Sequence, residues 1–404
     1  MNLIRISTRI FPDKGGPAKQ AFLLSQYSAK NLINTMNIAS LPKSLDKAQR
    51  TKINSNFQIY YLPFHAPEDD APFITKFFFF LKFSVFSFMK ILKIRKKHNI
   101  DIIHAHSPIP SGYIAYICFK LFHIPYVFTM HGLDYPNSLF LNTEINLTLK
   151  NARKTIVVSQ MILNYLKTNF ALNNIVWIPN GIDLRKYYSV SDLAEKEKII
   201  RKLDIAQKLS KDNFIISYIG YMFFKQKVRG MINFLNAFSL FLDELSSSVD
   251  KNKIKLIFIG DGPFSPLLKN RIKNSRHQDS ILFMGKRKDV EDFLAISDLC
   301  ALTSYIEGNP NVILEAMASK VPCIGSDVGD IKFMIENTGF IVEPGNIEQI
   351  KQKILHYFEL SKKERKTLGE EAYNKVKTHF SMERIIKRLL AVYEDPYQLN
   401  RSNK

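Results

Sequence analysis

Short apolar runs alternate with longer amphipathic stretches along the chain. LIRIST at 3–8 is such a run, and a glycine turn and a helix starting near Pro17 follow it. Further strands are expected at 101–107, 125–132, 154–159 and 174–183, with helices between them. Strands that are separated by helices join through right-handed crossovers, so this order predicts a parallel α/β sheet.

The same pattern starts again in the second half of the chain. Strands are expected at 213–220, 255–263, 280–286, 298–304, 322–327 and 339–344, and residues 347–395 are helical and charged. The polar, helix-prone stretch 187–212 between the two halves is interpreted as a linker. The sequence therefore predicts a first domain over 1–186, a second over 213–375 and a C-terminal segment over 376–404.

Length and cysteine usage agree with two folded domains. The 404 residues exceed what one ordinary core holds, and the three cysteines are far apart, without disulfide or metal-ligand spacing. That usage favours a reducing cytoplasm. Arg5 and Arg9 interrupt the apolar start, which does not resemble a signal peptide, and no stretch reaches the roughly 20 uncharged residues of a spanning helix.

The positive charge is concentrated in the first half. The net charge is +20, of which residues 1–190 carry 23 − 9 = +14 and the rest 34 − 28 = +6. Such a bias favours an anionic partner, namely a lipid surface, a phosphorylated acceptor or nucleic acid, although lysine can also serve solubility alone. No recognised nucleic-acid module is present, so nucleic acid is not expected.

Residues 76–98 form the most basic and aromatic stretch. Phenylalanine dominates it, and it has no acid and seven cations, which are Lys76, Lys82, Lys90, Lys93, Arg95, Lys96 and Lys97. This composition predicts a helix that lies on an anionic membrane surface. The alternative is an internal helix whose lysines extend to solvent.

The stretch EGNPNVILEAMASKVP at 307–322 carries the candidate chemistry. Pro310 suits a first helical turn, and an apolar stripe follows at helical spacing, so Glu307 lies beside the helix start and Glu315 within the helix. Backbone N–H groups of residues 308–311 then suit an anionic oxygen, and the carboxylates suit hydroxyl groups. The stretch therefore predicts a site for a polyhydroxyl ligand that carries phosphate.

In its wider context, EGNPNVILEAMASKVPCIGSDVGD resembles the donor-binding signature of family four glycosyltransferases, retaining enzymes of the GT-B fold (glycosyl transferases group 1). GGPA at 15–18, HAHS at 104–107, MHG at 130–132, IPNGID at 178–183 and IGDGP at 259–263 match further landmarks in order. The resemblance implies two Rossmann-like domains facing a central cleft. The first would bind the acceptor and the second the nucleotide sugar, and the C-terminal helix would cross back to the first.

The resemblance also implies residue roles. Glu315 would bind the ribose hydroxyls and Glu307 the transferred sugar, while His131 would face the donor sugar. Backbone contacts to the donor would come from Gly15, Gly16, Gly220, Gly308, Asn309, Asn311 and Val312. Alternatives stay open, in which His131 is a packed strand-end residue, Gly15–Gly16 an ordinary turn, and Glu307 or Glu315 a capping or solvent-exposed carboxylate.

The sequence departs from the family where the leaving diphosphate needs positive charge. Tyr221 occupies the position of the family arginine, and Arg229 that of the family lysine, with Lys225 and Lys227 nearby. These three cations are the candidates for stabilising the leaving group. No Asp-x-Asp motif is present, so neither a metal nor a cofactor is expected.

These observations and the resemblance predict a glycosyltransferase that moves a sugar from a nucleotide-diphosphate sugar to a lipid-linked or polysaccharide acceptor, as in capsule or lipopolysaccharide assembly. Retention at the anomeric carbon is implied by the resemblance alone. The protein is expected in the cytoplasm, peripheral on the inner face of the membrane. The alternative from another class is a catalytically silent, nucleotide-sugar-binding subunit, which Tyr221 favours. An epimerase or glucan synthase on the same fold is a further enzyme alternative.

Overall fold

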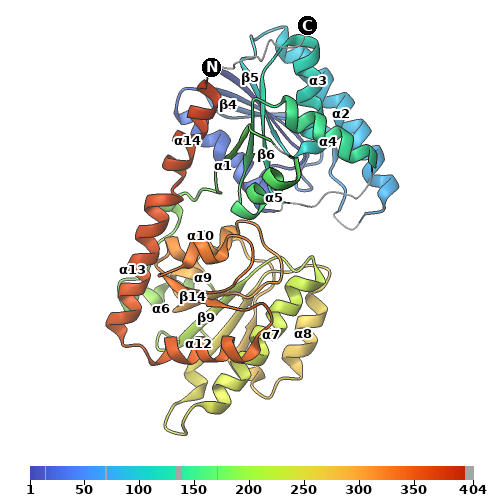
Figure 1. Cartoon of the computed structure of the whole chain (residues 1–404). Coiled ribbons are helices and arrows are strands. Elements are labelled where there is room, and N and C mark those ends of the chain that lie inside the picture. Colours follow the sequence, from blue (N-terminus) through green and yellow to red (C-terminus); the bar gives the residue numbers. More distant parts are fainter. Residues whose placement is uncertain (14, 69–70, 133–138, 171, 396–404) are drawn as a thin grey trace. The chain divides into compact units, whose positions relative to one another are not determined.

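The computed structural model describes residues 1–13, 15–68, 71–132, 139–170 and 172–395, without the side chains of 139–144. The chain forms two compact units, Met1–Asn180 with Met382–Lys404, and Gly181–Ser381 (Figure 1). Each unit is an α/β structure around its own sheet, as the alternation of strands and helices predicted. Residues 396–404 of the expected C-terminal segment lie outside the described residues.

The sheet of the first unit has the strand order β3-β4-β2-β1-β5-β6-β7-β8. Among these described strands, β3 alone runs antiparallel to its neighbour. The strands are β1 (Asn2–Ser7), β2 (Asn34–Leu41), β3 (Arg50–Asn54), β4 (Phe57–His65), β5 (Ile102–His106), β6 (Tyr126–Met130), β7 (Lys154–Val157) and β8 (Ile175–Trp177).

Helices cover both faces of this sheet. Successive residues of a strand point to opposite faces, and Leu3 packs with α1 (Gly16–Lys30) and α14 (Met382–Glu394), whereas Ile4 packs toward the other helices. The helices on that second face are α2 (Phe73–Arg95), α3 (Tyr113–Phe122), α4 (Leu139–Asn151) and α5 (Gln160–Phe170). A short π-helical segment, Pro108–Gly112, precedes α3.

Strands β2, β3 and β4 were not predicted. β2 buries Thr35 and Asn37, whose polar side chains interrupt the apolar run that marks a strand in the sequence. Asn37 is paired with Ser25 of α1 by a hydrogen bond of 2.8 Å. The strand is therefore buried on both faces without being uniformly apolar.

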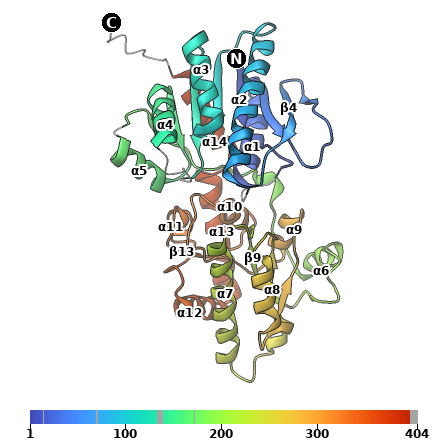
Figure 2. The ribbon, with the colours of Figure 1, turned by 90° about the vertical axis from the view of Figure 1, so that its right-hand side faces the viewer.

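The second unit contains a fully parallel sheet with the order β11-β10-β9-β12-β13-β14. Its strands are β9 (Phe214–Ile219), β10 (Ile254–Ile259), β11 (Ile281–Phe283), β12 (Leu299–Leu302), β13 (Cys323–Ser326) and β14 (Gly339–Val342). Its helices are α6 (Leu193–Lys202), α7 (Lys225–Glu244), α8 (Ser265–Lys273), α9 (Val290–Ala295), α10 (Asn311–Ala318), α11 (Ile331–Ile335), α12 (Ile347–Glu359) and α13 (Lys362–His379). Figure 2 shows these elements from a second direction.

The expected linker 187–212 is wrong as a separate segment. It contains α6, and Ile199, Ile200 and Leu203 belong to the core of the second unit. The boundary lies between Asn180 and Gly181, and the chain returns to the first unit at Met382 rather than at residue 376. Helix α6 is amphipathic, so its average composition is polar although one of its faces is buried. Composition alone therefore suggested a linker.

The helices of the described chain include none that is long and apolar enough to cross a membrane.

Candidate active site

The candidate residues occupy the carboxyl edges of the two parallel sheets. In the second unit, Gly220 follows β9, three cations begin α7, and residues 307–315 follow β12. In the first unit, Gly15 and Gly16 follow β1 and His131 follows β6. Parallel α/β sheets bind ligands at this edge, so the fold places both groups of residues where a ligand would be bound.

Glu307 forms an ion pair with the first turn of α7. Lys227 Nζ lies 3.2 Å from one carboxylate oxygen of Glu307 and 3.4 Å from the other. The Glu307 side chain is only 9% exposed, and that of Lys227 is 31% exposed. Because a buried carboxylate requires a partner, the pair fixes Glu307 beside α7 instead of leaving it as a solvated loop residue.

The loop that carries Glu307 is locked against the start of α11. The Asp330 N–H donates to Gly308 O at 2.8 Å, and the Asn309 Nδ2 group donates to Asp330 Oδ2 at 3.3 Å. Gly329 has a φ of +56°, and a Cβ there would lie 2.3 Å from Glu307 O. Asn309, expected to offer its backbone, therefore uses its side chain to hold the loop, and only glycine fits at 329.

Glu315 is buried within α10 and contacts Tyr187, which lies in the stretch 187–212 that was expected to be a linker. Pro310 is the N-cap of α10 rather than a residue of its first turn, and Glu315 is 8% exposed. Burial, followed by the charge of Glu315 and a hydrogen bond to it, raises the pKa of Tyr187 well above its ordinary value. The Tyr187 hydroxyl therefore keeps its proton and donates to the carboxylate.

The first two turns of α7 concentrate positive charge. Lys225, Lys227 and Arg229 lie there, and the first turn contains no acid. Cations are unfavourable at the positive end of a helix dipole, so this arrangement indicates a site for an anion. The guanidinium of Arg229 lies 5.0 Å from the centre of the Tyr305 ring, which accepts a 2.7 Å hydrogen bond at its hydroxyl from Asn233.

Tyr221, where the family arginine was expected, lies in an aromatic loop. Its side chain is 38% exposed and its ring stacks on Phe223, with ring centres 5.9 Å apart. The preceding Gly220 donates its N–H to Ile259 O at the end of β10. Tyr221 therefore supplies a ring face and not a positive charge.

In the first unit, the glycine turn forms the start of α1. Gly15 is the N-cap with a φ of +107°, a backbone conformation that residues other than glycine rarely adopt. Gly16 and Pro17 then begin the helix. The turn exposes backbone N–H groups at the carboxyl edge of β1, which is the geometry that anion binding requires.

His131 belongs to a row of three stacked histidines. Its Nε2 lies 3.0 Å from Nδ1 of His106, whose ring stacks on that of His104 with centres 4.6 Å apart. Burial lowers the pKa of His131 to about 4 from its ordinary value of 6.5. Burial first, and neighbouring charges second, also lower the pKa values of His104 and His106. All three rings are therefore neutral at pH 7.

The histidine row extends to α14 through a buried arginine. His104 Nδ1 lies 2.6 Å from the hydroxyl of Tyr393, which accepts a 2.8 Å hydrogen bond from the fully buried Arg5. The Nε2 atom of His104 lies 2.8 Å from Thr129 Oγ1. Sequence reasoning missed this network because its members come from β1, β5, β6 and the last helix.

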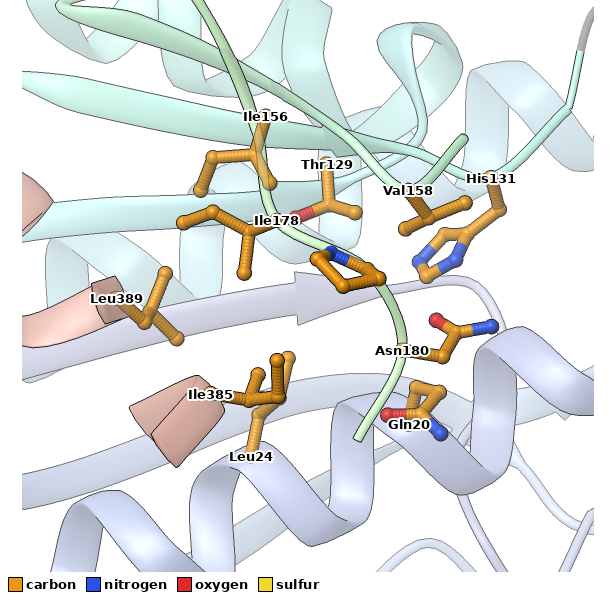
Figure 3. A pocket seen from close by; sticks show the side chains of 11 residues that line it. Gln20, Leu24, Thr129, His131, Ile156, Val158, Ile178, Asn180, Ile385 and Leu389 are labelled. Carbon is orange, nitrogen blue, oxygen red and sulfur yellow. The ribbon is translucent and has the colours of Figure 1, made fainter. Parts of the chain in front are cut away.

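A small pocket adjoins His131 (Figure 3). Its inner part is apolar, and Gln20 of α1, Asn180 and His131 gather at one end. The remaining lining residues are Leu24, Thr129, Ile156, Val158, Ile178, Pro179, Ile385 and Leu389. The pocket links the start of α1 with the histidine row inside the first unit.

Comparison with known proteins gives the same assignment. Residues 60–186 match the family model described as Glycosyltransferase Family 4, and residues 213–359 match that described as Glycosyl transferases group 1. The chain is 28% identical over 323 residues to N-acetyl-alpha-D-glucosaminyl L-malate synthase of Bacillus anthracis, covering 78% of this chain and 80% of that protein.

Two further proteins extend this comparison. The chain is 22% identical to the UDP-Gal:alpha-D-GlcNAc-diphosphoundecaprenol alpha-1,3-galactosyltransferase of Escherichia coli, covering 76% of this chain and 79% of that one. The solved structure of Anabaena Alr3699/HepE with UDP and glucose superposes with a TM-score of 0.75 at 17% identity, over 98% of this chain and 99% of that one.

The fold is thus GT-B, with two Rossmann-like domains in one chain. The chain belongs to the family four glycosyltransferases, and it is a glycosyltransferase.

Proposed function

We propose that this glycosyltransferase moves a sugar from a nucleoside-diphosphate sugar to a lipid-linked or polysaccharide acceptor, with retention at the anomeric carbon. The observation that carries the proposal is the cluster of Glu307, Lys227 and Arg229 at the carboxyl edge of the second sheet, with Glu315 in the next helix. Carboxylates for hydroxyl groups and cations for a diphosphate are the chemistry that such a donor requires.

The roles divide between sugar and leaving group. Glu315, held by Tyr187, accepts hydrogen bonds from the ribose hydroxyls, and Glu307 accepts them from the transferred sugar. Lys225, Lys227 and Arg229 neutralise the charge that develops on the diphosphate as the anomeric bond lengthens. The backbone of Gly220, Gly308, Asn309, Asn311 and Val312 borders the donor, as do Gly15, Gly16 and His131 from the first domain.

The chemical step needs no protein nucleophile. The acceptor oxygen forms its bond to the anomeric carbon on the face from which the diphosphate leaves, and the bond between that carbon and the phosphate oxygen breaks. The departing phosphate oxygen takes the acceptor proton. Because charge grows on the diphosphate in this step, its cations contribute to the rate more than to binding.

The acceptor class rests on the relatives. The Escherichia coli protein acts, by its name, on a sugar linked to diphosphoundecaprenol, and a staphylococcal relative at 24% identity is named for capsular polysaccharide biosynthesis. We accordingly place the enzyme on the cytoplasmic face of the membrane. UDP-sugars are the first donors to test, because the Anabaena structure holds UDP and glucose.

Turnover by the purified full chain tests this function. We expect release of a nucleoside diphosphate from one of a panel of UDP-, GDP- and ADP-sugars when a diphosphoundecaprenol-linked sugar is present, and an α-linked product by NMR when the donor is α. Lys227→Met should reduce turnover at least tenfold, and the matched Lys273→Met in α8 should not. Binding without turnover of any donor would support the silent subunit that Tyr221 favours.

We also propose that the reaction needs no metal ion, since Lys225, Lys227 and Arg229 at the start of α7 supply the positive charge that we assign to the diphosphate. Excess EDTA should leave the rate of turnover unchanged. A rate that falls with EDTA and returns with Mg²⁺ would contradict this part alone.

A further inference from the structure

Helix α2 has a buried face and an exposed apolar face. The residues that it buries in the first-domain core are Phe83, Ser87, Ile91 and Ile94. On the opposite side lies a row of side chains that are 42–57% exposed, which we call the outer stripe, formed by Ile74, Phe78, Leu81, Val85 and Met89. Their spacing of three or four residues places them on one side of the helix.

The outer stripe is a surface and not a scatter of single residues. Fifteen helical steps separate its ends, a length of roughly 22 Å at 1.5 Å per residue. Figures 1 and 2 both show α2 on the outside of its domain, beside α3. Contiguous exposed apolar surface of this kind marks a site of protein or membrane interaction.

The cations of α2 are divided by their orientation. Lys90 Nζ lies 5.1 Å from the centre of the Tyr60 ring, and Arg95 lies 4.3 Å from that of Phe122, so both side chains turn back onto the protein. Lys82 and Lys93 lie next to the outer stripe at helical spacing, and neither takes part in an ion pair within the described chain. No aspartate or glutamate occurs between residues 71 and 97.

We infer that the outer stripe of α2 is the membrane-docking face of this protein, with the helix axis parallel to an anionic bilayer. The apolar side chains enter the boundary between headgroups and acyl chains, and Lys82 and Lys93 contact lipid phosphates. A second copy of the chain fits less well, because a symmetric pair of stripes would bring like charges together. This inference is independent of the donor site.

Vesicle flotation of the full chain tests the inference without any nucleotide. The protein should float with vesicles of phosphatidylcholine containing about 30% phosphatidylglycerol and stay unbound with phosphatidylcholine alone. Lys82→Gln/Lys93→Gln should weaken binding about 30-fold, since each lysine near the surface contributes roughly fivefold. Phe78→Ser/Val85→Ser should weaken it more than about tenfold.

Matched variants separate this surface from general effects of charge and apolarity. Leu267→Ser in α8, whose side chain is 45% exposed, and Lys273→Gln in the same helix should bind vesicles as the unchanged protein does. Thermal melting confirms that each variant is folded. Flotation that is absent, or equal in all variants, would overturn the inference. A stable dimer in sedimentation that Phe78→Ser/Val85→Ser converts to monomer would assign the stripe to self-association and also overturn it.

Discussion

Each of the two domains has its own sheet of mainly parallel strands, but the carboxyl edges of the two sheets are formed in different ways. In the second domain, Glu307 and Glu315 lie on one loop and the helix that follows it, and backbone contacts hold this loop through Gly329 and the bond from Asp330 to Gly308. In the first, His131 is supported by a row of neutral histidines that ends at Arg5 and Tyr393. The comparison shows that charged side chains on a loop held by its backbone, and neutral rings in a packed row, can lie at corresponding edges of two similar sheets.

The largest expected effect is that acid lowers the folding stability of the first domain. The folded pKa of His131 is about 4 and its ordinary value 6.5, so the unfolded chain takes up the proton first. Stability is intact above pH 6.5 and is lost as the pH falls toward 4, by about 2 kcal/mol at pH 5 for His131 alone. His104 and His106 shift in the same direction and add to the loss.

The single tryptophan, Trp177 in β8, lets its fluorescence report unfolding of the first domain. Urea unfolding at pH 7.5 and pH 5 should show the loss, and His131→Asn should remove about 2 kcal/mol of it. Equal stability at both pH values would mean that the histidines are not buried in the neutral state.

Replacing Gly329 should produce the next largest effect, now in the second domain. Gly329→Ala adds a Cβ 2.3 Å from Glu307 O at a φ of +56°, which should cost about 3 kcal/mol of folding free energy. Gly285→Ala is the matched control, because Gly285 has a φ of +63° with nothing within 4 Å of the added atom, and it should cost about 1 kcal/mol. Equal losses in circular-dichroism unfolding would show that the loop is not held as described.

Removing the charge of Glu307 should affect activity more than stability. Glu307→Gln loses charge-assisted hydrogen bonds worth about 1.5–3 kcal/mol, so kcat/KM should fall roughly 10- to 150-fold while the chain stays folded. The ion pair with Lys227 is lost as well, but it is partly exposed and contributes less. Unchanged kcat/KM would remove Glu307 from the site.

The smallest expected effect is a loss of nucleotide affinity when the hydrogen bond from Tyr187 to Glu315 is removed. Tyr187→Phe removes the hydroxyl that donates to Glu315, and nucleotide affinity should fall about three- to tenfold, the worth of one hydrogen bond. Tyr188→Phe is the control, since Tyr188 donates to Asp292 instead. Affinity that is lowered equally by both changes would mean a general loss of folding, not a role for Tyr187.

Much of the second domain could be predicted from the sequence. Its strands are continuous apolar runs, and the sequence alone places Glu307 on the loop after one strand and Glu315 in the helix that follows. The role of Tyr187 could not be found in this way, because residues 187–212 are polar in composition although they supply core side chains. The only sequence feature that could have indicated this role is the position of Tyr187, four residues after IPNGID.

The hydrogen-bond network behind the carboxyl edge of the first domain could not be predicted from the sequence for a different reason. Arg5 and Tyr393 are separated by 388 positions and meet only because α14 returns to β1. A lone buried arginine surrounded by neutral groups has no spacing pattern. Sequence likewise could not sort the phenylalanines of residues 76–98 into packed and exposed ones, which required the orientation of α2.

The dependence of nucleotide binding on Glu315 directly tests the assignment of the donor site to the second domain. Thermal unfolding of the full chain would be measured with UDP, GDP, ADP and CMP and their sugars, and repeated on Glu315→Ala. A ligand that binds only the folded state raises the melting temperature by mass action. We predict a clear shift with one nucleotide, and none with the same nucleotide on Glu315→Ala. An equal shift in both proteins would place the nucleotide elsewhere and contradict the assignment of the donor site to the second domain.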